Sequence, residues 1–148
     1  MFLKGLWDQH RAQKWNREQL RKSFGKAGRT EYADGEVNGI VRYFEKHPKD
    51  FQIDDITWND LNLDEIFLRM NSTCSSAGQE YLYAMLRSPS FEEKELQERE
   101  KLLEFLEQDE EMRVRMQEIF FKIGRTGKYS LYDYMDFLDV LGERKNGK

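Results

Sequence analysis

The stretch from Asp54 to Leu106 constrains the fold of this chain most, because it contains an apolar helix that a proline must end. Residues 78–89 read GQEYLYAMLRSP, and the apolar residues leave little polar face, which predicts a helix that buries most of its surface. Pro89 lacks the N–H for a further turn and disfavours helical geometry at Ser88. A long charged helix follows, so two helices joined by a short proline turn are predicted at the centre of the fold.

Capping patterns predict the starts of several further helices. A capping residue stands three positions before an acidic or amide partner in Asn62-x-x-Glu65, Ser76-x-x-Gln79, Ser90-x-x-Glu93 and Ser130-x-x-Asp133. Each pair introduces an apolar-periodic run, and the apolar side chains of the predicted helices are expected to point inward. These side chains are Leu63, Ile66, Phe67, Met70, Leu96, Leu102, Leu103, Leu106, Met112, Met116, Ile119, Phe120, Ile123, Leu131, Tyr134, Leu138 and Leu141. A first helix is predicted over about residues 9–23, and a second ends at His47-Pro48. A link over residues 49–61, anchored by Trp58, follows. The remaining predicted helices cover residues 63–70, 77–87, 91–108, 110–123 and 131–141.

Length and composition fit a helical protein. The 148 residues are enough for one domain, with 39% hydrophobic and 35% charged residues and two prolines. We therefore expect an all-α antiparallel helical bundle of about six to seven helices. The expected organisation is a basic amino-terminal helical arm over residues 1–49, a helical domain over 50–141, and a polar tail over 142–148 where a longer protein would continue.

Charge is unevenly distributed along the chain. Residues 1–30 hold eight Lys/Arg and two Asp/Glu, a net charge of +6, whereas the remainder holds sixteen and twenty-six, a net charge of −10. Such an arm suits nucleic acid or an acidic membrane surface, and it equally suits an arm that lies on its own acidic body. The residues of the arm that could contact nucleic acid or a partner are Lys14, Arg17, Arg21, Lys22, Lys26 and Arg29.

Catalytic and metal-binding patterns are weak in this sequence. Residues 124–128 read GRTGK, which only approaches a phosphate-binding loop, because the segment is too short and Tyr129 stands where a hydroxyl of Ser or Thr is needed. His10 and His47 have no Cys or carboxylate at ligand spacing, so no metal site is expected. Cys74 precedes a helix start, and we interpret it as a small corner residue rather than a nucleophile.

Cysteine usage and hydropathy suggest a compartment. A single cysteine cannot form an internal disulfide, and the start MFLKGLWDQH lacks the apolar run of a secretory signal. No apolar stretch approaches the roughly 18 residues that a membrane span needs. We expect a cytoplasmic location and no membrane contact by these residues.

One known family shares the central motifs. Ile53-Asp54-Asp55-x-Thr57 and Asn59-x-Leu61 are followed by Asn71-x-Thr73-x-Ser75-x-x-Gly78-x-Glu80-x-Leu82-x-x-x-Leu86-x-x-Pro89. After these come Leu96-x-x-Arg99 and Leu102-Leu103-x-Phe105-Leu106. Together they resemble the start of the core (lever) domain of MutS-type mismatch-repair ATPases, closest to the bacterial MutS-like branch that lacks the mismatch-reading domain. The resemblance covers roughly residues 50–141.

This resemblance implies a scaffold rather than a catalytic role. In the family, the domain links the ATPase to the DNA-embracing clamp, which implies that ATP and Mg²⁺ bind elsewhere in a longer protein. It also implies DNA, the chain's own ATPase domain and a second copy as partners, and some proteins of the branch continue into membrane-spanning helices. The residues that would build the scaffold are Thr57, Thr73, Gly78, Leu82, Leu86, Pro89 and Arg99.

Three functional hypotheses follow. The leading one, based on the motifs between Asp54 and Leu106, is a module of a MutS-like ATPase that couples nucleotide state to DNA or partner binding. We expect it to be non-catalytic because the sequence lacks Walker motifs. The second is a stand-alone helical nucleic-acid-binding adaptor that uses the basic residues of positions 1–30. The third, a small enzyme with Cys74 as nucleophile, has the least support because no paired histidine base is evident.

Overall fold

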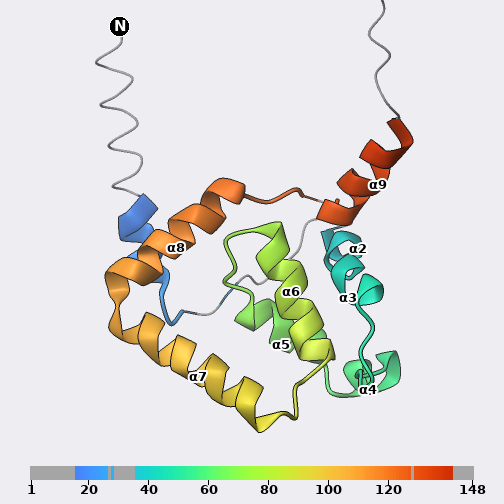
Figure 1. Ribbon diagram of the computed structural model, residues 1–148, viewed down its shortest axis with the longest axis horizontal. Helices are drawn as coiled ribbons and strands as arrows, with labels where there is room; N and C mark the ends of the chain where they lie inside the picture. Colours follow the sequence, from blue (N-terminus) through green and yellow to red (C-terminus); the bar gives the residue numbers. More distant parts are fainter. Residues whose placement is uncertain (1–15, 27, 29–35, 128, 142–148) are drawn as a thin grey trace, which may run out of the picture. The chain divides into compact units, whose positions relative to one another are not determined.

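A computed structural model describes residues 16–26, 28, 36–127 and 129–141 of the chain. Within these ranges every regular element is helical, so the predicted all-α class is confirmed. No described helix is both long and apolar enough to span a bilayer. Residues 16–23 are helical, and the helices that follow are α2 (Glu36–Ile40), α3 (Arg42–Lys46), α4 (Asp55–Asp60), α5 (Leu63–Met70), α6 (Ser76–Arg87), α7 (Glu93–Gln108), α8 (Glu110–Ile123) and α9 (Leu131–Leu141) (Figure 1).

Most predicted helix limits agree with the structure. Helices α5, α8 and α9 have the predicted ends, α6 begins one residue earlier, and α7 begins two residues later. The predicted helix before His47 is two short helices, because residue 41 is a turn. The predicted link contains α4, which buries its aromatic anchor Trp58. Residues 9–15 of the first predicted helix lie outside the described residues.

Contacts between residues divide the chain into two compact units. Unit 1 combines Met1–Lys26 with Phe91–Ile123, and unit 2 combines Ala27–Ser90 with Gly124–Lys148. The helices on either side of Pro89 therefore belong to different units, α6 to unit 2 and α7 to unit 1. The division of the sequence into an arm, a lever-like domain and a tail stays a prediction.

The core of unit 2 is largely aromatic. Tyr83 of α6 lies between Trp58 and Phe67, with ring centroids 5.1 and 5.5 Å away, and Phe44 of α3 approaches its ring edge-on at 6.0 Å. Ile40 of α2 completes the buried cluster. The indole N–H of Trp58 stays satisfied because it donates a 2.9 Å hydrogen bond to Asp64. Helix α6 thus joins α2, α3, α4 and α5 into one core.

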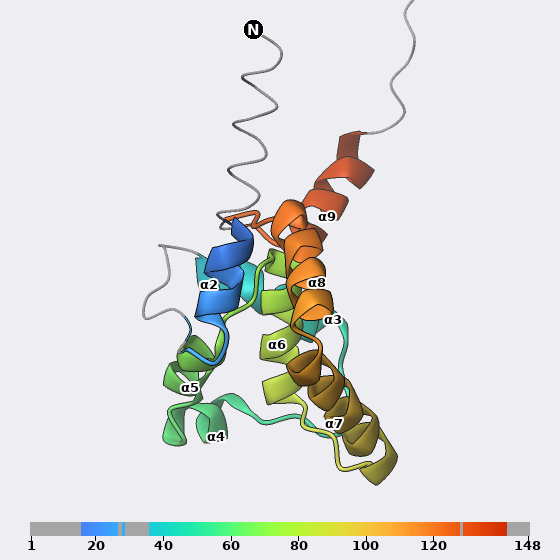
Figure 2. The ribbon, with the colours of Figure 1, turned by 90° about the vertical axis from the view of Figure 1, so that its left-hand side faces the viewer.

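Unit 1 is organised around a buried arginine. The guanidinium of Arg113, in α8, donates to the backbone oxygen of Leu106 at 2.8 Å and so satisfies a carbonyl near the end of α7. Its central carbon lies 3.7 Å from the centroid of the Phe24 ring. Asp109 caps α8 by accepting from the Met112 N–H at 2.9 Å. These contacts fix the corner between α7 and α8 that Figure 2 shows.

Several apolar faces predicted to point inward are instead exposed. The periodic pattern marks which side of a helix is apolar, but it carries no information about which element covers that side. The prediction of an inward side chain is wrong for Ile66, Met70, Leu96, Leu102, Leu103, Met112, Ile119, Phe120, Ile123, Leu131, Tyr134, Leu138 and Leu141, each of which is more than a third exposed.

Candidate functional site

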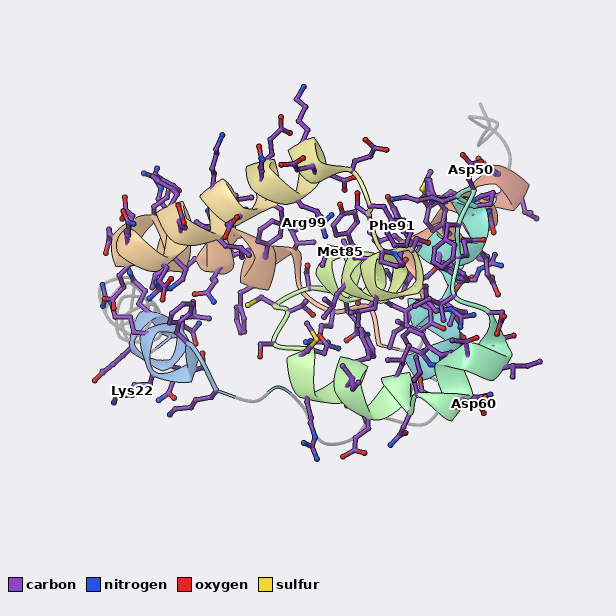
Figure 3. All side chains as sticks on the ribbon, turned by 90° about the horizontal axis from the view of Figure 1, so that it is seen from below. Lys22, Asp50, Asp60, Met85, Phe91 and Arg99 are labelled. Atoms are coloured by element: carbon purple, nitrogen blue, oxygen red, sulfur yellow. The ribbon has the colours of Figure 1, made fainter. Side chains whose placement is uncertain are left out.

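Helix α6 buries a row of mostly polar side chains. It is largely covered, as predicted, but its most buried residues are not the apolar ones: Tyr81 is exposed, and Met85 (labelled in Figure 3) is half-buried. Buried polar groups cost free energy unless they are hydrogen-bonded, so a buried polar face marks a place where structure is specified closely. We call the buried residues of α6 its polar stripe: Ser76, Gln79, Glu80, Tyr83 and Arg87.

A hydrogen-bonded corner precedes α6. Asn71 is 0% exposed, its amide donates to Gln79 Oε1 at 3.0 Å, and its own oxygen accepts from the Thr73 hydroxyl at 2.6 Å. Ser75 caps the helix by accepting from the Gly78 N–H at 3.2 Å. The predicted capping residue Ser76 is therefore displaced by its neighbour, and the chain turns tightly from α5 into α6.

The absence of a side chain at position 78 is used in this corner. A Cβ atom there would lie 3.3 Å from Ser75 Oγ, closer than most such contacts, and 3.4 Å from Thr73 Cβ, at an ordinary van der Waals distance. Gly78, one of the scaffold residues that the resemblance implies, therefore lies where the chain packs closely on itself. The two other predicted scaffold residues on α6 also have a packing role. Leu82 and Leu86 both pack on the aromatic core.

The loop between α8 and α9 closes over the start of α6. The Arg125 guanidinium contacts both Gln79 Oε1 and the backbone oxygen of Thr73. Thr126 N–H donates to Ser76 Oγ at 2.8 Å, and Ser76 N–H donates to the Gly124 oxygen at 3.1 Å. Residues 124–128, which loosely resemble a phosphate-binding loop in sequence, therefore hold this corner in place by hydrogen bonds.

Glu80 connects the polar stripe to α9. The residue is 3% exposed, and Glu80 Oε1 accepts from the Leu131 N–H at 3.3 Å, at the first residue of α9. Burial raises the pKa of the Glu80 carboxyl, and nearby Asp133 raises it further, whereas the hydrogen bond from Leu131 lowers it. Ser130 and Asp133 form the predicted capping box, with reciprocal bonds of 2.8 and 3.1 Å.

Arg87 closes the other end of α6. It is 5% exposed, it pairs with Asp55, and it donates to the Asp54 backbone oxygen at 3.4 Å. Its guanidinium carbon lies 4.8 Å from the centroid of the Phe44 ring and 5.0 Å from that of Trp58, within the range of cation–π attraction. The carboxyl end of α6 is thereby tied to the turn that begins α4.

Asp54 shapes that turn. Its side chain caps α4 by accepting from the Thr57 N–H at 2.7 Å, and this hydrogen bond lowers the pKa of the Asp54 carboxyl. The predicted scaffold residue Thr57 thus acts through its backbone. Pro89 is half-buried just after α6, whereas Arg99 belongs to unit 1, where it pairs with Glu95 one turn earlier at 2.8 Å (Figure 3).

Arginines of the predicted nucleic-acid arm pair with acidic residues of unit 1. Arg17 contacts Glu111, which raises the pKa of Arg17 and lowers that of Glu111. Arg21 lies 2.9 Å from Glu110 and 3.1 Å from Glu111. Lys22 pairs with Glu18 at 3.1 Å, and the Lys26 N–H donates to Ser23. Lys14 and Arg29 lie outside the described residues.

Cys74 sits in the corner before α6 and is half-buried. Burial raises the pKa of its thiol, and the charge of Arg125 offsets this only in part. A raised pKa disfavours the thiolate that nucleophilic attack requires. In the part of the chain that the structure describes, no group of three His, Cys, Asp or Glu is arranged to hold a metal ion.

Sequence reasoning missed the two arginines that close the site. Arg125 was hidden in the loop between two helices, and Arg87 resembled an ordinary basic residue in the last turn of a helix. No protein-family model, no curated protein and no solved structure matches this chain, so the resemblance stated above rests on its own motif residues.

Proposed function

We propose that this chain is a non-catalytic helical module of a MutS-type ATPase, equivalent to the start of the core/lever domain, that couples nucleotide state to DNA or partner binding. One observation carries the proposal: the motif residues behind the resemblance come from two separate segments and contact the two ends of one helix. Asp54 and Asp55 contact Arg87 at the end of α6. Asn71 and Ser75 bond to residues in its first turn.

A mechanical role suits this arrangement. A helix can transmit a displacement only if both of its ends are fixed to neighbouring elements. Helix α6 is fixed at its start by buried hydrogen bonds and at its end by a buried arginine. Hydrogen bonds in a buried site are directional and costly to break, so they favour one arrangement of the neighbouring elements. The raised pKa of the Cys74 thiol favours this role over nucleophilic catalysis.

ATP and Mg²⁺ enter only through the resemblance. The 148 residues contain no Walker motif, so the residues present do not fit a nucleotide and none is assigned to one. The purified chain is expected to hydrolyse no ATP above background. Hydrolysis that a point substitution in this chain abolishes would contradict the proposal. The reading frame downstream of residue 148 provides a second test, in which a P-loop is expected.

The coupling itself can be tested in the longer protein. Asn71→Ala is expected to reduce the stimulation of ATP hydrolysis by DNA, while basal hydrolysis, which would depend on residues elsewhere, stays unchanged. Arg69→Ala is the matched control, because Arg69 lies two residues away and pairs with Glu65 at the exposed surface. Equal stimulation in both variants and the wild type would contradict a lever role for this corner.

The adaptor hypothesis remains the second candidate. It predicts duplex binding that weakens steeply with salt and disappears when residues 1–30 are deleted. The ion pairs of Arg17 and Arg21 with acidic residues of α8 compete with phosphate for the same guanidinium groups, which favours the module over the adaptor. Duplex binding that is indifferent to the deletion would exclude the adaptor.

A further inference from the structure

Helix α9 contacts the rest of unit 2 through its acidic face. Arg42 of α3 lies 3.2 Å from Asp133 and 3.0 Å from Asp136, and Lys46 lies 3.2 Å from Asp136. The hydroxyl oxygen of Tyr132, on the same side of the helix, lies 3.4 Å from His47 Nε2. These side chains are a third to a half exposed, and ion pairs of this kind contribute about 0–1 kcal/mol each. The acidic face of α9 is therefore occupied, but only weakly held.

The opposite face of α9 is apolar and open. Leu131, Tyr134, Leu138 and Leu141 follow one another at spacings of three, four and three residues, which places them on one side of the helix. We call these four residues the apolar seam; Leu138 is 65% exposed. Alternating spacings of three and four are the pattern by which two helices interlock their side chains. The seam therefore has the form of a helix-pairing surface.

The amount of open surface suits a small dimer. The seam, together with its flanking residues Met135 and Phe137, exposes about half of each of six large side chains. Aromatic side chains bury ~150–250 Å² each, and with that range as an upper value for the leucines and the methionine, the exposed part amounts to at most roughly 600 Å² per copy. Two copies that cover all of it would bury about 1,200 Å², which is the lower end of the range for specific protein interfaces.

A hollow beside the seam provides a place for a partner side chain. Its volume is about 320 Å³, and it is lined by Tyr129, Asp133, Tyr134 and Phe137. That volume is large enough for an aromatic side chain. Interfaces commonly place an aromatic anchor in such a pocket, surrounded by apolar contacts that exclude water.

We propose that the apolar seam of α9 pairs with the same seam of a second copy of this chain. The seam complements itself, because it is apolar along its whole length. Asp133 and Asp136 are neutralised by Arg42 and Lys46, and Asp133 keeps this ion pair where it lines the hollow, so these two carboxylates do not oppose the pairing of two seams. A membrane surface is a poorer fit, since helices that lie on membranes carry Lys and Arg on the polar face, where α9 carries Asp. The inference rests on unit 2 alone and is independent of the proposed function.

Sedimentation of the 148-residue chain over a range of concentrations tests the pairing. The wild type is expected to associate reversibly into a dimer, and Leu138→Glu, which would bury an unpaired charge, is expected to weaken association by about 100-fold or more. The matched control is Val140→Glu, on the same helix but off the seam, at a residue that is 84% exposed. A monomeric wild type, or equal weakening in both variants, would overturn the inference.

Chemical cross-linking keeps the inference testable if Leu138→Glu perturbs folding. In a Cys74→Ser background, Leu138→Cys treated with a bismaleimide is expected to give a covalent dimer, whereas Val140→Cys is expected to give little. Flotation with vesicles of phosphatidylcholine, with and without phosphatidylserine, tests the membrane. Binding to vesicles that Leu138→Glu abolishes, without dimerisation in solution, would overturn the pairing.

Discussion

Helices α6 and α9 are both in unit 2, and both turn polar side chains toward the protein, but they do so under different conditions. The polar stripe of α6 is buried and bonded to residues of four other segments, as the contacts of Gln79, Glu80 and Arg87 show. The acidic face of α9 meets two basic residues of α3 at a partly exposed surface. The polar contacts of the two helices therefore differ chiefly in how well they are shielded from water.

Burial decides how much a polar contact specifies. Removing one partner of a buried hydrogen bond lowers the free energy of unfolding, because the other partner is left buried without a hydrogen bond. An exposed ion pair is easily replaced by water and salt ions. We infer that α6 is a fixed part of unit 2, whereas the contact of α9 with α3 is weaker.

The largest expected effect is at Arg87. Arg87→Ala removes the bond to Asp54, the pair with Asp55, and the packing of the guanidinium against the Phe44 and Trp58 rings. We expect a loss of about 3 kcal/mol in the free energy of unfolding, measured by urea denaturation followed by circular dichroism. Arg69→Ala, which breaks an exposed pair within one helix, should cost less than about 0.5 kcal/mol. Similar losses in both variants would mean that burial of Arg87 has no energetic weight.

A somewhat smaller effect is expected at Asn71. Asn71→Ala leaves Gln79 and the Thr73 hydroxyl without one partner each in a buried corner, which should cost about 2 kcal/mol. Gln79→Ala and the double variant complete a cycle of measurements. Their effects should not add, because the two side chains share a hydrogen bond. Additive losses would show that the corner is a set of independent contacts rather than a network.

Local signals explain what the sequence predicted well. The limits of α5, α8 and α9 and the Ser130–Asp133 box depend on residues within one turn of each helix end, so they are readable without knowledge of the fold. The break at residue 41 between α2 and α3 has no proline or glycine at that position, and the sequence predicted one continuous helix there. Where the local sequence contains no helix-breaking residue, packing against other elements decides whether the helix continues.

The polar stripe could not be predicted in the same way. Its partners, Asn71 and Arg125, stand 8 and 46 residues from Gln79, and no periodic pattern links them. Periodicity assigned the buried face of α6 to its apolar residues, because burial of polar groups is normally unfavourable. The structure reverses that assignment by giving Gln79, Glu80 and Arg87 hydrogen-bond or ion-pair partners from other segments.

A pH-dependent effect is expected at Glu80. A buried carboxyl with a raised pKa binds its proton more tightly in the folded state, so its charged form lowers stability at pH 7 and this penalty fades as the pH falls through the raised pKa. Glu80→Gln keeps an oxygen for the Leu131 N–H without a charge. The variant should therefore be more stable than the wild type at pH 7, by less than the change at Asn71, and the gain should shrink toward pH 4. A gain that grows on acidification would contradict this assignment.

The smallest effect is expected at Arg42. Arg42→Ala removes the pairs with Asp133 and Asp136, and because these are partly exposed, the unfolding free energy should fall by about 0.5 kcal/mol, and by less at high salt. Hydrogen exchange provides the sharper comparison. Amides of α9 should exchange faster in Arg42→Ala while those of α6 stay protected, because only the contact of α9 with α3 has been weakened. Faster exchange in both helices would mean that α9 is as firmly integrated into unit 2 as α6, and the distinction between the two helices would fail.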